Sequence, residues 1–137
     1  MIIAVSACLL GYNCKYNGGN NNSEKVAEFV RGHEVIPVCP EVMGGLPTPR
    51  EPSEIVNGIV KHKDGSLVDA EFRKGAEAAL KKVKEAGAEL VILQSRSPSC
   101  GVSSIYDGTF SGTIIPGQGI FAKLLIDNNI KVMDVND

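Results

Sequence analysis

Short runs of apolar residues alternate along this chain with longer segments in which apolar residues recur every three or four positions. The short runs, typical of buried strands, occupy residues 2–7, 34–38, 90–93 and 130–135. The periodic segments, typical of amphipathic helices, occupy residues 23–31, residues 69–86 and the stretch after the PGQG turn at 116–119. Strands that alternate with helices in this way form a mainly parallel sheet with helices packed on it. The pattern therefore predicts a three-layer α/β fold.

Each of the first two predicted helices has an apolar face and a stop signal. Ser23 is a suitable N-cap for the first helix and Gly32 ends it, while Gly87 ends the second. The residues expected on the inner faces are Val26, Phe29 and Val30 in the first helix, Phe72, Ala76, Ala79, Leu80 and Val83 in the second, and Ile120, Phe121, Leu124 and Leu125 in the last.

The segments between these elements are rich in turn residues. Residues 39–54 contain so much proline and glycine that we expect no regular structure there. Between residues 55 and 68, the tight-turn pairs Asn57-Gly58 and Asp64-Gly65 predict a small β-hairpin insertion, one hairpin or two, attached to the main sheet. A further loop with turn signals follows at 107–119. Without repeats or linkers, residues 1–137 are expected to form a single domain.

Composition excludes several classes of protein. The net charge is -2, aromatic residues make up 5% of the chain and tryptophan is absent, so binding to duplex or single-stranded nucleic acid is not expected. No apolar run approaches the roughly 20 residues that cross a bilayer. The N-terminal stretch lacks the basic start of an export signal. We therefore expect a cytoplasmic protein with no membrane partner, and the sequence does not predict its oligomeric state.

The candidate functional residues are four cysteines: Cys8, Cys14, Cys39 and Cys100. Without an export signal, free thiols, a metal or catalysis are favoured over disulfides. Cys8 and Cys39 directly follow predicted strands, and Cys100 lies a few residues beyond the strand that ends at residue 93. Ligands bind at the carboxyl ends of strands in such sheets. A lone cysteine is usually a small buried hydrophobe, but three at strand ends favour a shared thiolate site.

The identity of the metal stays open at this point. Four thiolates suit either zinc or an iron–sulfur cluster. Structural zinc usually has paired ligands at short spacing, whereas these cysteines are scattered one per loop, which weakly favours a larger cluster. Redox chemistry of free thiols is disfavoured because no C-x-x-C motif is present.

Several long segments resemble the signature blocks of the domain family DUF523. They are SACLLGYNCKYNGG (6–19), CPEVMGGLPTPREPSE (39–54), SRSPSCG (95–101) and DGTFSGTIIPGQGIFAKLL (107–125). The family includes the thiouracil desulfurases, which carry a [4Fe-4S] cluster on three cysteines and leave the fourth iron open for the substrate sulfur. The resemblance implies that Cys8, Cys39 and Cys100 are the ligands, with Cys14 as an alternative; our preference rests on Cys14 lying well out in its loop.

The same resemblance implies a catalytic carboxylate and a catalytic serine. The carboxylate is Glu41, which on its own would be read as a solvated loop residue. The serine is one of Ser95, Ser97 and Ser99, and we rank Ser97 first. The expected reaction is hydrolytic removal of sulfur from a thiolated nucleobase or nucleotide such as 2-thiouracil, with the substrate sulfur on the open iron and Glu41 taking a proton from water.

Two further interpretations and one alternative function remain. Arg50 and Arg96 are either substrate clamps or solvated surface residues. The start of the last helix is a candidate phosphate site if the substrate is a nucleotide. The alternative function is a non-catalytic zinc or iron–sulfur protein, either a sensor or a sulfur carrier.

Overall fold

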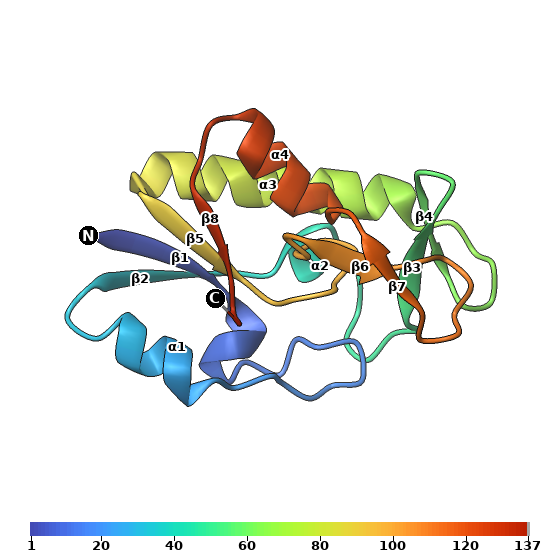
Figure 1. Cartoon of the computed structure of the whole chain (residues 1–137), viewed down its shortest axis with the longest axis horizontal. Coiled ribbons are helices and arrows are strands. Elements are labelled where there is room, and N and C mark those ends of the chain that lie inside the picture. Colours follow the sequence, from blue (N-terminus) through green and yellow to red (C-terminus); the bar gives the residue numbers. More distant parts are fainter. Residues whose placement is uncertain (137) are drawn as a thin grey trace.

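A four-stranded parallel sheet forms the centre of the protein, as seen in a computed structural model that describes residues 1–136. Its strands are β1 (Ile2–Ser6), β2 (Glu34–Val38), β5 (Leu90–Leu93) and β8 (Val132–Asp134), in the order β2-β1-β5-β8. Helices α3 (Asp69–Ala86) and α4 (Ile120–Asp127) lie on one side of the sheet, and α1 (Glu24–Phe29) and the 3-10 turn η1 (Ala7–Leu10) lie on the other (Figure 1). The predicted three-layer α/β fold is confirmed. The last residue of the predicted domain, Asp137, lies outside the described residues.

The side chains of β1 and β5 point alternately to the two faces of the sheet, so they contribute to two hydrophobic cores, one on each face. Ala4 and Val91 point to the side of α3 and α4, where they join a fully buried cluster. Ile3 and Ile92 point to the opposite side, where they pack with Val26 of α1. Both strands are buried on both faces, because successive side chains of a strand point to opposite faces and helices cover each of them. The predicted runs at residues 2–7 and 90–93 are therefore the two interior strands of the sheet, and the runs at residues 34–38 and 130–135 contain its edge strands.

The predicted helices are present, with two differences in the first one: α1 ends at Phe29, with Val30 rather than Gly32 at its end, and one expected core residue is exposed. Helix α3 has the predicted bounds, and Gly87 ends it in the left-handed conformation with φ 71°. In α1, Ser23 caps the helix by accepting from the amide of Val26. Phe29, however, is 49% exposed rather than buried, because it is the last residue of α1 and lines a shallow apolar groove beside Met133. None of the helices in the described part of the chain has the length and apolar character that crossing a membrane demands.

Two hairpins lie beyond the carboxyl ends of the sheet strands (Figure 1). Strands β3 (Ser53–Val56) and β4 (Ile59–His62) are joined by the predicted Asn57-Gly58 turn, both residues having positive φ. This hairpin is a separate two-stranded sheet, so the prediction that it is attached to the main sheet is wrong. The loop expected at 107–119 instead contributes to a second hairpin, β6 (Ser104–Tyr106) with β7 (Ile114–Pro116). Glu54 joins the two hairpins by accepting from the amides of Gly108 and Phe110.

The segment expected to lack regular structure contains a short helix, α2 (Pro40–Met43). Cys39 is its N-cap and Pro40 its first residue, a position where proline costs no hydrogen bond. Helix α2 packs closely on α3 because both contribute glycine at the crossing. A Cβ at Gly75 would collide with the carbonyl oxygen of Pro40, and one at Gly44 with that of Glu71. These two glycines therefore set the position of α2 relative to the core.

We expect Gly75→Ala to destabilise the protein although alanine is the better helix former. Alanine normally gains roughly 1 kcal/mol over glycine inside a helix. Here the added methyl group meets backbone, so overpacking should cost about 1–3 kcal/mol net and push α2 away from α3. Urea unfolding measures the effect. Lys74→Ala, at the exposed position next to Gly75, is the control and should change the free energy of unfolding by less than about 0.5 kcal/mol. Unchanged stability of Gly75→Ala would contradict the close helix contact.

Candidate active site

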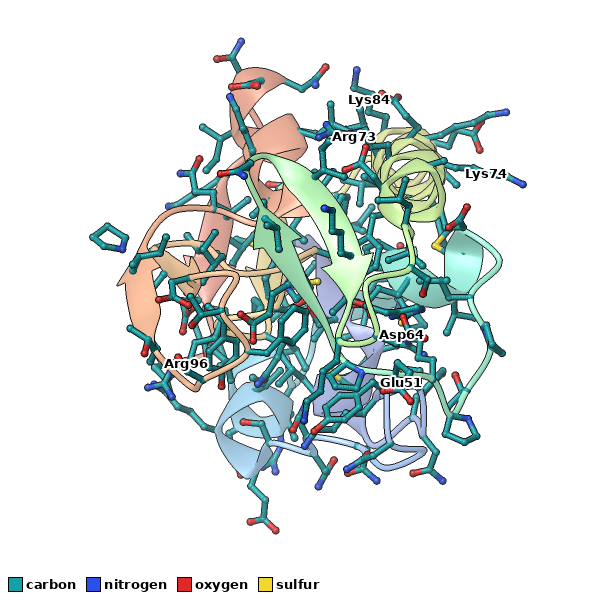
Figure 2. All side chains as sticks on the ribbon, turned by 90° about the vertical axis from the view of Figure 1, so that its right-hand side faces the viewer. Glu51, Asp64, Arg73, Lys74, Lys84 and Arg96 are labelled. Carbon is teal, nitrogen blue, oxygen red and sulfur yellow. The ribbon has the colours of Figure 1, made fainter. Side chains whose placement is uncertain are left out.

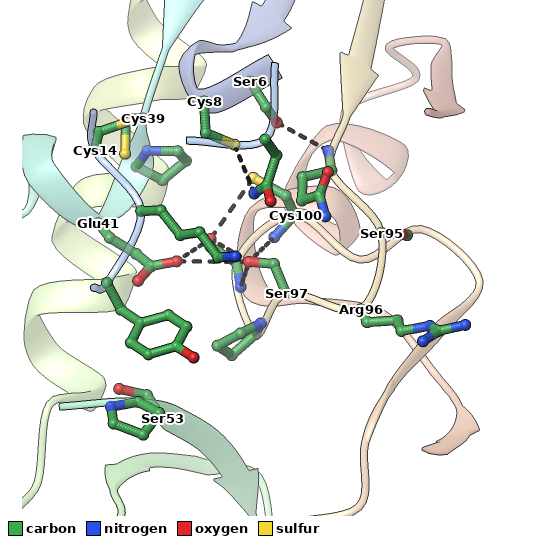
Figure 3. Close-up of a pocket in the computed structure, with 18 of the residues that line it drawn as sticks. Ser6, Cys8, Cys14, Cys39, Glu41, Ser53, Ser95, Arg96, Ser97 and Cys100 are labelled. Atoms are coloured by element: carbon green, nitrogen blue, oxygen red, sulfur yellow. Dashed lines mark hydrogen bonds between the residues drawn. The ribbon is translucent and has the colours of Figure 1, made fainter. Parts of the chain in front are cut away.

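A cavity of about 470 Å³ opens beyond the carboxyl ends of β1, β2 and β5. Its walls come from the cysteine loops, from α2 and from the two hairpins, so segments far apart in the chain surround one space (Figure 3). The volume lies in the range of small-molecule sites. Its place at the strand ends is where ligands bind to open α/β sheets, as expected from the sequence.

Each of three cysteines reaches the cavity from a different strand. Cys8 lies in η1 immediately after β1, Cys39 caps α2 immediately after β2, and Cys100 lies in the turn that follows β5. All three line the cavity, and no cysteine is in a disulfide in the described part of the chain. The structure thus brings together the three residues that the sequence placed at strand ends.

Cys14 lies in the same cavity, so the expectation that it lies far out in its loop is wrong. Its thiol lies within hydrogen-bond reach of both Cys8 and Cys39. The Cys14 thiol lowers the pKa of Cys8 to about 7, and the Asn21 amide, which donates to Cys8 Sγ at 3.5 Å, adds to this effect. The Cys14 thiol also lowers the pKa of Cys39, with help from the backbone amide of Val42. The pKa of Cys14 itself is raised by hydrogen bonding to the sulfurs of Cys39 and Cys8.

Cys100 is in a different environment. Burial raises the pKa of its thiol to about 12, and the Ser6 and Ser99 hydroxyls, which hydrogen-bond with its sulfur, oppose that rise only in part. Its side chain is 5% exposed, although the sulfur faces the cavity wall. Such a thiol gives up its proton when its sulfur binds a metal cation.

The thiols suit a metal centre larger than one ion. Within residues 1–136, no three His, Cys, Asp or Glu side chains converge closely enough to hold a single metal ion. Soft thiolate donors are nevertheless present around one cavity, and thiolates are the usual ligands of iron–sulfur clusters. The donor set therefore fits the cluster that the resemblance implies better than it fits a zinc ion.

Glu41 faces two serines across the cavity. Ser99 Oγ donates to Glu41 Oε2 at 2.9 Å, and Ser97 Oγ lies 3.5 Å from the same oxygen. The hydroxyls of Ser97 and Ser99 are 2.9 Å apart. Glu41 comes from the first turn of α2 and both serines come from the loop after β5, so the fold joins residues more than 50 positions apart in the sequence (Figure 3).

The direction of the hydrogen bonds in this group follows from counting donors and acceptors. Ser97 Oγ accepts from the backbone amides of Ser99 and Cys100, both at 3.1 Å, which occupies its two lone pairs. Ser97 must therefore donate to Ser99 Oγ, and Ser99 must donate onward. Ser99 Oγ also lies 3.6 Å from Cys100 Sγ, but the shorter contact to the charged carboxylate is the stronger one. The result is a directed chain of hydrogen bonds, from Ser97 to Ser99 to Glu41, that fixes the orientation of the carboxylate.

The other candidates from the sequence lie outside this hydrogen-bonded group, although Ser95 and Arg96 also line the cavity. Ser95 lies outside the chain of serines, within 3.4 Å of the Asn136 amide. Arg96 is exposed and points away from the cysteines, at the outer edge of the hairpin end (Figures 2 and 3). The start of α4 is no phosphate site, because the amides of Ile120 and Phe121 donate to the carbonyls of Pro98 and Ser99. A Cβ at Gly119 would meet that loop within 2.5 Å.

Sequence reasoning missed one contributor to the site and left the roles of two others open. Asn21, which was not considered, donates to Cys8. Ser99, ranked below Ser97, is the serine that donates to Glu41 at 2.9 Å, and Arg50 is buried beside Glu41. Only the charge of Arg50 was a signal in the sequence, and nothing in the PTPREP segment indicates which way its side chain points.

Comparison with known proteins agrees with this geometry. A family model described as 2-thiouracil desulfurase matches residues 3–137. The uncharacterized protein YbbK of Bacillus subtilis (strain 168) is 40% identical over 146 residues, covering 99% of this chain and 97% of YbbK. The solved structure of the [4Fe-4S]-dependent thiouracil desulfidase TudS superposes with a TM-score of 0.92 at 39% identity, covering 98% of this chain and 90% of TudS. By the extent of these matches, the chain belongs to the 2-thiouracil desulfurase family, the family to which its signature blocks pointed.

Proposed function

We propose that this protein is a [4Fe-4S]-dependent desulfurase that removes sulfur hydrolytically from a thiolated nucleobase or nucleotide of the 2-thiouracil kind. The observation that carries the proposal is the convergence of thiols, Glu41 and the paired serines on one cavity. Membership of the family and the likeness to TudS support the cluster and the substrate class. The cytoplasm, where thiols stay reduced, is the compartment we expect.

Cys8, Cys39 and Cys100 are the proposed ligands. Each of them follows a different strand of the sheet, β1, β2 or β5, and all three line the cavity. Cys14 shares its loop with Cys8, whereas Cys100 comes from a separate loop after β5. One ligand from each strand end is therefore the reason for proposing Cys100 rather than Cys14.

The chemistry divides between the cluster and the protein side chains. When bound, a cluster held by Cys8, Cys39 and Cys100 would supply a Lewis acid for the substrate sulfur, which would make sulfide a better leaving group. Glu41 takes a proton from the water that attacks the carbon carrying sulfur. Ser99, which accepts from Ser97, holds Oε2 of that carboxylate in place by donating to it. Overall, thiocarbonyl and water give carbonyl and hydrogen sulfide, so no oxidant or reductant is consumed.

The outer part of the cavity suits a planar base. Tyr16, Tyr106 and Phe110 contribute aromatic rings to its walls, and such rings stack on nucleobases. Lys15 and Lys63 bring positive charge to the same cavity, which suits the phosphate of a nucleotide form of the substrate.

We expect anaerobically reconstituted protein to convert 2-thiouracil to uracil with release of one sulfide per uracil. In ¹⁸O-labelled water, each uracil should gain one ¹⁸O atom, because water supplies the new carbonyl oxygen. Iron and sulfide assays establish cluster content, and protein stripped of iron is the control. A parallel assay with 2-thiouridine monophosphate tests the nucleotide form. Loaded protein that releases no sulfide from either compound, or protein that binds only zinc, would count against the proposal.

A further inference from the structure

Arg50 is almost completely buried, with 4% of its side chain exposed, directly beside the candidate carboxylate. A guanidinium has five N–H donors. In this protein, they make five hydrogen bonds: Nε and Nη2 to Glu41 Oε1, Nη2 to the Cys14 carbonyl, and Nη1 to the Pro47 carbonyl and the Thr48 hydroxyl. No donor is left for a ligand, so Arg50 is neither the substrate clamp nor the solvated residue considered from the sequence.

Arg50 and the serines bind different oxygens of the Glu41 carboxylate. Oε1 accepts from Arg50 Nε at 3.2 Å and from Nη2 at 3.0 Å. Oε2 accepts from Ser99 at 2.9 Å. Rotation of the carboxylate would break contacts on both sides, so Oε2 stays directed at the serines and the cavity. Within residues 1–136, the side chains that hydrogen-bond with the Glu41 carboxylate are those of Arg50, Ser97 and Ser99.

Arg50 also connects Glu41 to the loop that carries Cys14. Its Nη2 donates to the Cys14 carbonyl at 3.0 Å, and its backbone amide donates to the Tyr16 carbonyl at 2.7 Å. One buried side chain thus joins α2 with the loop at 14–16, and both line the cavity.

We infer that Arg50 is a positioning residue, which acts through Glu41 by holding its Oε1 so that Oε2 faces the reacting water. This inference rests on the proposed function, in which Glu41 is the base. Lysine cannot replace arginine in this role, because a single ammonium group cannot place donors on Glu41, Cys14 and Pro47 at once.

The test compares Arg50→Lys with the parent protein, both loaded with the cluster. We expect kcat for 2-thiouracil to fall about 100-fold, since a misplaced catalytic group can cost that much, while KM stays within about 3-fold. Iron content should be unchanged, and a crystal structure should show Glu41 Oε2 displaced from Ser99. In a Glu41→Gln background, Arg50→Lys should cause no further loss, because residues that act as a unit are not additive. Arg31→Lys, at an exposed arginine paired with Glu28, is the matched control.

Three results would overturn the inference: an unchanged kcat in Arg50→Lys, a loss of kcat that only follows loss of iron, or an equal loss in the Glu41→Gln background. Other results would reject the proposed function itself. If Glu41→Gln retains full turnover, or if the parent protein releases no sulfide, the desulfurase mechanism is wrong. Displacement of Glu41 in the Arg50→Lys crystal structure would then still support the positioning role, and an undisplaced Glu41 would reject it.

Discussion

Replacing Cys8, Cys39 or Cys100 singly with serine is expected to remove most of the iron from the protein, whereas Cys14→Ser should leave it. Serine keeps the size of the side chain but supplies a hard, rarely ionised oxygen in place of a soft thiolate. With only three protein ligands, the loss of one leaves two, which is too few to hold a cluster firmly. Iron and sulfide per chain after anaerobic reconstitution, together with the absorption spectrum, measure the result.

Cys14→Ser is a demanding control because Cys14 shares the cavity with the proposed ligands. It removes the thiol that lowers the pKa of Cys8 and Cys39, yet it leaves both sulfurs free to bind iron. Reconstitution should therefore reach the parent iron content. If Cys14→Ser loses iron while Cys100→Ser keeps it, Cys14 is the third ligand, and the argument from one cysteine per strand end is wrong. Circular dichroism of each variant distinguishes ligand loss from misfolding.

The sequence predicted the central fold because burial on both faces of a strand leaves a continuous apolar run. Leu90–Leu93, which is buried throughout, has the predicted bounds for this reason. Glu34–Val38 also has the predicted bounds although it is an edge strand in which only Val38 is buried, and both strands deliver the chain to the cavity. Because Cys39 comes directly after β2, its position at the cavity could be predicted as well. The second hairpin was missed because β6 and β7 are three residues each and β7 is exposed throughout, so neither has a periodic pattern to detect.

The sequence could not predict those contacts that depend on two backbone segments lying very close together. Helix α2 was not expected because proline and glycine usually disrupt regular structure, whereas here Pro40 begins the helix and Gly44 lets it touch α3. The burial of Arg50 depends in turn on where α2 places Glu41. The resemblance to the family supplied Glu41 and Ser97 as candidates, but the link through Ser99 required the fold.

Glu41→Gln is expected to keep the cluster and lose desulfuration. Glutamine has the shape of glutamate and retains an acceptor for Arg50, so α2 and the cysteine beside it should stay in place. It cannot accept a proton from water, and loss of a general base typically costs about 10²–10⁴-fold in kcat. Steady-state release of uracil and sulfide from 2-thiouracil, expressed per loaded cluster, measures the effect. Glu51→Gln, the same substitution at an exposed residue of the next segment, should leave kcat unchanged.

Glu41 is a cleaner test of the mechanism than either serine. Ser97 accepts from two backbone amides, so Ser97→Ala also loosens the turn that carries Cys100, and lost activity would have two explanations. Ser99 is 1% exposed and lies beside Cys100 Sγ, so its removal also alters a proposed ligand. In Glu41→Gln, the side chain keeps its size and loses the proton acceptor together with its negative charge, which raises the pKa of the Cys8, Cys39 and Cys100 thiols. Because activity is expressed per loaded cluster, turnover equal to that of the parent would rule out Glu41 as the base.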